Sequence, residues 1–257
     1  MKFHLTSPSV TSRLFPAVVK DGIDPFMTEA AVVPYDIPHQ LFDVVIHDTG
    51  LRVGYWRSVS HALNSFANES FMDEMAAAAG KDPYQFRRGL LDKQPRLKRV
   101  LELAAEKAGW GTPPPSGRFR GLGLMEGYGT SMAQVAEVSV TGKTVRVHRV
   151  VVAADLGKMV NPNIVKQQLE SSIIYGLSAV LYGEITLKDG RVQQSNFHDY
   201  QVVRMPESPR IDIHLVESSE KPSGIGEPGT AVIGPAVANA VFAATGQRLR
   251  KLPLRLA

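Results

Sequence analysis

Cysteine is absent from the 257 residues of this chain. That absence excludes disulfides, thiolate zinc sites, iron–sulfur clusters and cysteine nucleophiles within the chain itself. The seven histidines never lie three or four positions apart, so no helix carries a local metal-binding pair. A membrane-length apolar run, a signal-peptide core, a Walker loop and a G-x-S-x-G elbow are also missing. We therefore expect no direct membrane span and no metal held by side chains of this chain.

The charge pattern argues against a nucleic-acid partner. The net charge is only +4, and charged residues make up 21% of the chain. The densest basic stretch, RRGLLDKQPRLKR, includes an aspartate and lacks aromatic residues on which bases could stack. With 44% hydrophobic residues, the composition is that of an ordinary globular protein.

The first part of the chain reads as extended segments followed by helices. The stretch 41–50 predicts a strand that ends in a turn. A helix is predicted for 61–79, where the apolar residues follow helical spacing: Leu63, Phe66, Phe71 and Met75. Two more helices are expected, one beginning at Pro83 with Asp82 as its N-cap, and one over 95–109 that ends at a glycine.

A proline-rich connector, WGTPPPSGR, then marks a change of character. It divides the chain into a first lobe, residues 1–110, and a second lobe, residues 117–257. Beyond it, alternating apolar and polar residues predict hairpins that turn at Thr141-Gly142 and at Asp189-Gly190.

The rest of the second lobe mixes helices with strands. We expect a long helix over 162–183, a strand over 210–218 and a helix over 235–245 with proline at its start. Because strand pairs interleave with helices without a regular βαβ repeat, the expected fold class is α+β.

The stretch GIGEPG at 224–229 matches G-x-G-x-x-G, the pattern of a dinucleotide-binding loop. That pattern requires an acidic residue about 20 positions later, yet none of the 28 residues after Gly229 is acidic. Glu227 would also repel a pyrophosphate. The simplest alternative is a Gly/Pro turn before a helix. A third interpretation is that the glycines serve Glu227, because a carboxylate set against an apolar helix can act as a general base.

Two other stretches carry polar residues beyond what packing requires. Arg57 and Ser58 precede the helix predicted for 61–79, where free backbone N–H groups and a guanidinium can hold an anion. A helix cap with a surface arginine is an equally good interpretation. Gln167 and Gln168 interrupt an apolar helix, where they either find buried partners or form an exposed polar stripe.

At these residues the chain resembles the molybdenum-cofactor-binding subunit of the xanthine dehydrogenase/aldehyde oxidase family. It is most similar to the C-terminal portion of the isoquinoline 1-oxidoreductase β-subunit type. The resemblance runs nearly end to end, in matching order, through these segments: LTSPSVTSRLFP, KDGIDPFMTE, YDIPHQ, VGYWRSVSHALNSF, ESFMDEMAAAAGKDPYQFRR, DLGKMVNPN, YGEITLKDGRVQQSNFHDY and GIGEPGTAVIGPAVANAVFAATG.

The resemblance implies an α+β cofactor-binding fold with two lobes of mixed sheet plus helices. It implies a molybdopterin hydroxylase that oxidises an aldehyde or an N-heteroaromatic carbon with oxygen derived from water. Glu227 matches the glutamate of the family motif G-x-G-E-P, which acts as the general base. Arg57 and Ser58 match the motif F-R-G-F-G, and Gln168 matches Q-x-E-G. With Gly226, these three residues are expected to contact the cofactor.

Two serines, Ser58 and Ser171, stand where most relatives have glycine. The chain is also much shorter than the cofactor subunit of this branch, and the Gly-rich pterin contacts are missing. We therefore expect a partner chain, or the remaining segment of a longer protein, to complete the site.

The family further implies the cytosine dinucleotide form of molybdopterin and a ferredoxin-like 2Fe–2S partner subunit, since this chain has no cysteine. The sequence leaves the location open between the cytoplasm and the periplasm, which the chain would reach by export with a partner. The alternative function is a non-catalytic structural or interaction subunit that keeps the family fold without binding the cofactor.

Overall fold

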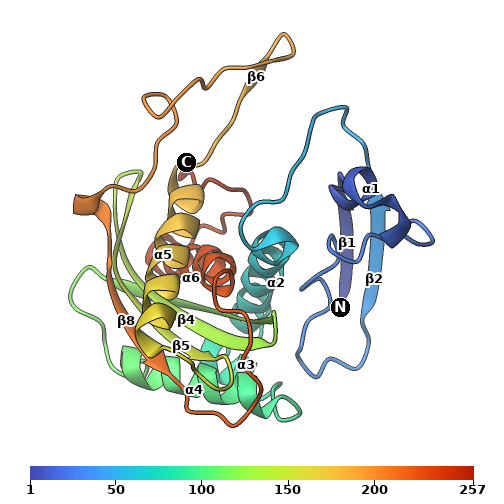
Figure 1. Cartoon of the computed structure of the whole chain (residues 1–257). Helices are drawn as coiled ribbons and strands as arrows, with labels where there is room; N and C mark the ends of the chain where they lie inside the picture. Colours follow the sequence, from blue (N-terminus) through green and yellow to red (C-terminus); the bar gives the residue numbers. More distant parts are fainter.

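The computed structural model describes residues 1–257. Its elements are β1 (Lys2–Ser7), α1 (Thr11–Leu14), η1 (Pro16–Val18), β2 (Leu41–Ile46), α2 (Val59–Ala78), α3 (Pro83–Arg88), α4 (Pro95–Ala108), β3 (Phe119–Gly127), β4 (Thr130–Thr141), β5 (Thr144–Asp155), α5 (Pro162–Leu181), β6 (Leu187–Lys188), β7 (Arg191–Val192), η2 (Met205–Glu207), β8 (Arg210–Leu215) and α6 (Pro228–Thr245). They form an α+β molecule (Figure 1), as predicted. The N-cap of α3 at Asp82 and the end of α4 at Gly109 are also confirmed.

The main sheet has the strand order β3-β4-β5-β8. β3, β4 and β5 are antiparallel neighbours, and β8 runs parallel to β5. The predicted turn joins β4 to β5, and Gly142 has the positive φ, 58°, that such a turn needs. Sequence periodicity does not predict β3, whose glycines weaken the strand signal. Gly121 is needed there because α6 packs so closely that a Cβ would clash with the backbone of Ala240.

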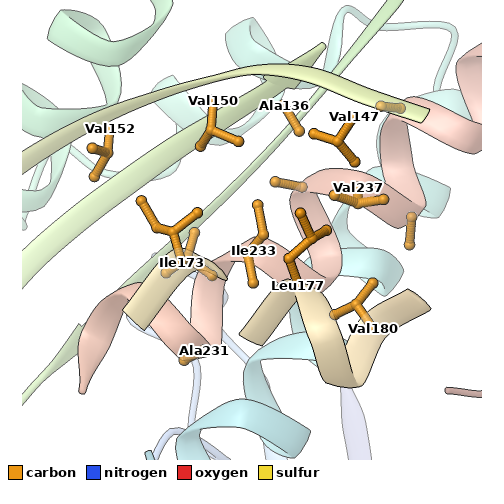
Figure 2. Packing of buried hydrophobic residues seen from close by; sticks show 14 of the residues in the cluster. Ala136, Val147, Val150, Val152, Ile173, Leu177, Val180, Ala231, Ile233 and Val237 are labelled. Atoms are coloured by element: carbon orange, nitrogen blue, oxygen red, sulfur yellow. The ribbon is translucent and has the colours of Figure 1, made fainter. Parts of the chain in front are cut away.

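The larger hydrophobic core lies between this sheet and helices α5 and α6 (Figure 2). Val150 and Val152 of β5 project toward Ile173 of α5 and Ile233 of α6, and all four side chains are fully buried. Burying each contributes about 1.5–3 kcal/mol. Helix α4 forms a second cluster with strands of the main sheet. This packing fixes α5 and α6 relative to one another, and both helices carry residues of the candidate site.

Helix α6 corrects the prediction for the C-terminal segment. The sequence rule starts this helix at Pro235, whereas it begins at Pro228, directly after Glu227, and contains Pro235 inside. Proline does occupy the first helical position, as the rule states, but that proline is Pro228 and not Pro235. Burial of nearly every residue of this helix as far as position 241 offsets the cost of the internal proline. By length and composition α6 could cross a membrane, but 78% of it is buried inside the protein.

Helix α2 confirms the helix predicted at 61–79 but buries an unexpected face. Leu63 and Phe71 are 63% and 44% exposed, whereas His61, Asn64 and Asn68 are buried. The two asparagines donate hydrogen bonds to backbone carbonyls in the segment 27–31. That segment has no helix or strand of its own, so its carbonyls need side-chain partners. The buried face of α2 therefore includes polar residues that bind these carbonyls.

Two parts of the chain stand away from the main sheet (Figure 1). The strand predicted at 41–50 is confirmed as β2, which pairs in parallel with β1. The hairpin predicted at Asp189-Gly190 is confirmed as β6–β7, and it lies on an arm that extends from the body.

The predicted boundary at 110–117 falls in the turn between α4 and β3. Buried residues from both sides of that turn share the second hydrophobic cluster, in which Leu97 and Leu101 of α4 pack with Leu122 and Val151 of the sheet. The division into two lobes stays a prediction.

Candidate active site

The five predicted site residues come from three distant parts of the sequence and meet at one place. Arg57 and Ser58 precede α2, Gln168 lies in α5, and Gly226 and Glu227 end the loop before α6. Because α6 packs against both α2 and α5, the three segments converge at its N-terminus. The structure brings these residues together, and their roles stay predictions.

Arg57 joins the three segments. Its Nε donates to the carbonyl of Gly226 at 2.7 Å, its Nη1 to Oγ of Ser171 at 2.9 Å, and its Nη2 to Oε1 of Gln168 at 3.1 Å. The guanidinium also lies 5.7 Å from the ring centroid of Tyr175, within cation–π range. The half-buried Arg57 therefore connects the segment before α2 to helix α5 and to the loop before α6.

Ser58 keeps a backbone conformation that suits glycine. Its φ is 82° and its ψ is 0°, and the φ of Val59 is also positive at 45°. A side chain in this left-handed region costs roughly 1–2 kcal/mol relative to glycine. In this conformation the Ser58 N–H donates to Oε1 of Glu227 at 2.9 Å. The left-handed turn gives a physical reason for glycine at this position of the matching motif.

Glu227 is the N-cap residue of α6, but its side chain does not cap its own helix. Its carboxylate accepts only the Ser58 N–H, so the second oxygen has no protein partner. Glu227 directly precedes the apolar helix α6, as predicted, and its charge also acts on Glu29, His61 and Tyr128. The result is an oriented carboxylate with one oxygen free to accept a proton.

The glycines of GIGEPG do not form a phosphate cradle. None of the three has a positive φ. A Cβ at Gly229 would clash with Oγ of Ser172 on α5, so this glycine permits the close packing of two helices. The Glu227 carboxylate also lies at the helix N-terminus that a pyrophosphate would need, which excludes the dinucleotide alternative.

Sequence reasoning missed three titratable residues beside Glu227. Burial raises the pKa of Glu29, and the charges of Glu227 and Asp24 raise it further. Burial lowers the pKa of His61, while the charge of Glu227 opposes that shift. Burial raises the pKa of Tyr128, and the charges of Glu227 and Glu29 add to the effect. No local pattern could link these residues, because only the fold brings them together.

An aromatic pair borders the site. The rings of Trp56 and Tyr175 stack with centroids 5.0 Å apart. Trp56 also lines a mostly apolar cavity of about 350 Å³, together with Phe26, Tyr55 and Leu63. This volume lies within the usual range for small-molecule sites.

The residues at this site fit a molybdopterin group. The side-chain oxygen of Gln168 is held by Arg57, which leaves its amide nitrogen as an oriented donor without a protein partner. The buried hydroxyl of Ser58 also lacks a partner, and a ligand or water satisfies such groups. Glycine at 226 keeps the surface beside Gln168 free of a side chain.

The α+β fold of this chain, with helices packed on one mixed sheet, is that of a known cofactor-binding domain. Residues 66–209 match the model of the molybdopterin cofactor-binding domain, and the chain belongs to this family. It is 35% identical to the beta subunit of isoquinoline 1-oxidoreductase from Brevundimonas diminuta, over 99% of this chain and 34% of that protein. It is 34% identical to a subunit of nicotinate dehydrogenase from Pseudomonas putida, over 87% of this chain and 20% of that protein.

The chain thus spans about a third or less of these relatives' lengths. Among solved structures, it resembles quinoline 2-oxidoreductase from Pseudomonas putida 86 with a TM-score of 0.76. That match has 12% sequence identity and covers 90% of this chain and 56% of that one, so it supports the fold. The predicted family and fold class are confirmed.

Proposed function

We propose that this chain is part of a molybdopterin-dependent oxidoreductase in which Glu227 is the general base. The substrate is an aldehyde or an N-heteroaromatic compound, oxidised with oxygen from water. The observation that carries this proposal is the placement of Glu227, held through one oxygen by the Ser58 N–H while the other stays free. Two relatives named for isoquinoline and nicotinate, both N-heteroaromatic compounds, support the substrate class.

Each site residue has a distinct task. When bound, the molybdenum cofactor supplies the two-electron oxidant for the substrate carbon. Arg57 fixes the Gly226 carbonyl and the Gln168 amide, so that the free amide N–H groups can bind an oxygen of the cofactor. The Ser58 N–H holds Glu227 in one orientation while its free oxygen takes the proton of the attacking water-derived oxygen.

Other parts of the enzyme lie outside this chain in our proposal. The cofactor is the cytosine dinucleotide form, and the remaining cofactor-binding segment or subunit supplies further pterin contacts. A ferredoxin-like 2Fe–2S subunit carries the iron–sulfur clusters, since this chain has no cysteine. Both relatives compared above are named as subunits, which supports an assembly of several chains.

Glu227→Gln in the assembled enzyme tests the base. The amide keeps the volume and can still accept from the Ser58 N–H, so cofactor and substrate should bind as before. The loss of a positioned general base lowers the rate by about 10²–10⁴-fold. We expect this loss in kcat, with KM changed much less. Anaerobic reduction of the enzyme by substrate, followed in a stopped-flow instrument, isolates this step from electron transfer.

Glu184→Gln is the matched control, because this exposed glutamate makes only a 3.8 Å ion pair with Arg255. It should reduce at the parent rate. Reduction of the Glu227→Gln enzyme within tenfold of the parent rate would show that Glu227 is only a turn residue.

A further inference from the structure

A second polar cluster lies beside Glu227, and none of the site motifs includes it. Glu29 comes from the segment before β2, His61 from α2, and Tyr128 from the turn between β3 and β4. Nδ1 of His61 lies 3.3 Å from Oε2 of Glu29. The His61 ring also packs on Tyr128, with ring centroids 4.6 Å apart. Gly127 makes room for the imidazole, because a Cβ there would clash with its Nε2.

Helix α2 holds Glu29 in place through its backbone. Nδ2 of Asn64 donates to the carbonyl of Glu29 at 2.7 Å and to that of Met27 at 3.1 Å. One turn further along, Asn68 donates to the carbonyl of Ala30 at 2.7 Å. His61, Asn64 and Asn68 share one buried face of the helix. The same face therefore supplies the imidazole and fixes the carboxylate opposite it.

The facing atoms of this pair have unmet hydrogen-bonding capacity. Oε2 of Glu29 and Nδ1 of His61 are both buried, and neither makes a hydrogen bond. His61 as a whole is only 4% exposed. A buried polar group without a partner is costly, and a proton shared between a carboxylate and an imidazole satisfies both groups. The geometry is that of a pair able to hold one proton.

Ser58 joins Glu227 to this pair, because its N–H donates to Oε1 of Glu227 at 2.9 Å and its carbonyl accepts from the backbone N–H of His61 at 3.0 Å. Glu227 is also electrostatically coupled to the pair. Its negative charge raises the pKa of Glu29 and opposes the lowering of the pKa of His61 by burial. The other groups that act on the cluster are Asp24, which raises the pKa of Glu29, and Tyr128, whose own pKa is raised by the two glutamates. Protonation of Glu227 therefore makes the pair less able to hold a proton. Once Glu227 is a carboxylate again, its negative charge stabilises a proton on the pair.

We propose that Glu29 and His61 accept the proton that each turnover leaves on Glu227, and so return Glu227 to its carboxylate form. The O–H bond on Glu227 breaks, and an O–H bond on Glu29 or an N–H bond on His61 forms, without any change in electron count. The pair then releases the proton to water at Glu29, whose side chain is 31% exposed, before the next turnover. This inference rests on the proposed base role of Glu227. Because the pair acts through Glu227, Glu29 and His61 are positioning residues in this proposal.

The first test is a titration that needs no cofactor. The ring of His61 is followed by NMR in the full chain, with His61→Gln used to assign its signal among the seven histidines. In Glu29→Gln the imidazole should become protonated only at lower pH than in the parent, because the adjacent carboxylate that favours imidazolium is gone. The fold should persist, since Asn64 contacts only the backbone of Glu29. Glu184→Gln should leave the titration unchanged.

The second test separates the first turnover from later ones in the assembled enzyme. In Glu29→Gln the first turnover should keep its rate, because Glu227 begins as a carboxylate. Steady-state turnover should fall about tenfold or more, in line with the usual contribution of a proton-transfer group. Added imidazole should restore part of the loss in His61→Gln.

An unchanged His61 titration in Glu29→Gln overturns the proposal, as does steady-state turnover within twofold of the parent. An equal loss in first and later turnovers also overturns it, because the pair would then support the base itself. Failure of the proposed function looks different: Glu227→Gln would keep its first turnover, whatever the histidine titration shows.

Discussion

Single residues explain how this chain departs from the family motifs without losing the site. The resemblance implies glycine at position 171, and the hydroxyl of Ser171 accepts a hydrogen bond from Arg57 at 2.9 Å. The hydroxyl thus adds one hydrogen bond to those that hold Arg57 in place. The resemblance also implies glycine at position 58, where the serine has a φ of 82° and a buried hydroxyl without a hydrogen-bond partner in this chain. Ser171 therefore adds a hydrogen bond, whereas Ser58 adds backbone strain.

Ser58→Gly should therefore stabilise the chain. Removing the left-handed strain stabilises the folded chain by roughly 1–2 kcal/mol. The larger entropy of an unfolded glycine opposes this by roughly 0.5–1 kcal/mol. We expect a net gain of about 1 kcal/mol in the free energy of unfolding, measured by urea titration. Ser60→Gly is the control, because Ser60 lies in the first turn of α2 without positive φ. It should destabilise by up to about 1 kcal/mol, and equal effects of the two changes would argue against strain at 58.

At the scale of elements, the site depends on how closely α6 approaches α5. Gly229 lies in the first turn of α6 and faces Ser172, whose hydroxyl donates to the carbonyl of Leu169. Oγ of Thr230 in turn donates to the carbonyl of Ser172 at 3.1 Å. The start of α6, and with it Glu227, is thus held against the middle of α5.

Gly229→Ala should destabilise by about 1–3 kcal/mol, because the added methyl overpacks this contact. Ser172→Ala removes the atom that the methyl would strike, so the double variant should regain most of the loss. A double-mutant cycle on unfolding free energies measures this coupling. If the losses of the two single variants simply add in the double variant, the methyl at 229 does not clash with the Ser172 hydroxyl.

The elements also show what sequence can and cannot predict here. The cap at Asp82 and the turn at Gly142 were predictable, because each depends on a few adjacent residues. The contacts of Arg57 with Gly226 and of Ser58 with Glu227 were accessible only through the family motifs. The pair Glu29 and His61 was not, because asparagine contacts between α2 and a segment without secondary structure create it. The polar inner face of α2 has the same cause. Helical periodicity detects apolar residues, but it does not show that Asn64 and Asn68 donate to backbone carbonyls of another segment.

One buried ionic network links α2 to several other parts of the molecule, because Arg87 pairs with both Glu69 at 2.8 Å and Asp73 at 3.6 Å. Glu69 of α2 accepts from Tyr35 at 2.6 Å, from Arg87 of α3 at 2.8 Å and from the backbone of Leu124 in β3 at 3.2 Å. Asp73, one turn further along α2, accepts from Arg248 near the C-terminus at 2.6 Å. The network thus fixes α2, whose N-terminus carries the candidate site, to the N-terminal segment, the sheet and the C-terminal tail.

Arg87→Met should be among the most destabilising substitutions in the chain. The Arg87 side chain is fully buried, and its removal leaves the carboxylate of Glu69 in the interior without its cation. Breaking a buried pair in this way costs about 3–5 kcal/mol. The matched control is Arg250→Met, since Arg250 also pairs with a carboxylate of α2, Glu74, but is 68% exposed. An exposed pair contributes only about 0–1 kcal/mol. Urea unfolding of the two variants should therefore differ by at least about 2 kcal/mol, and similar losses would mean that burial does not set the strength of this network.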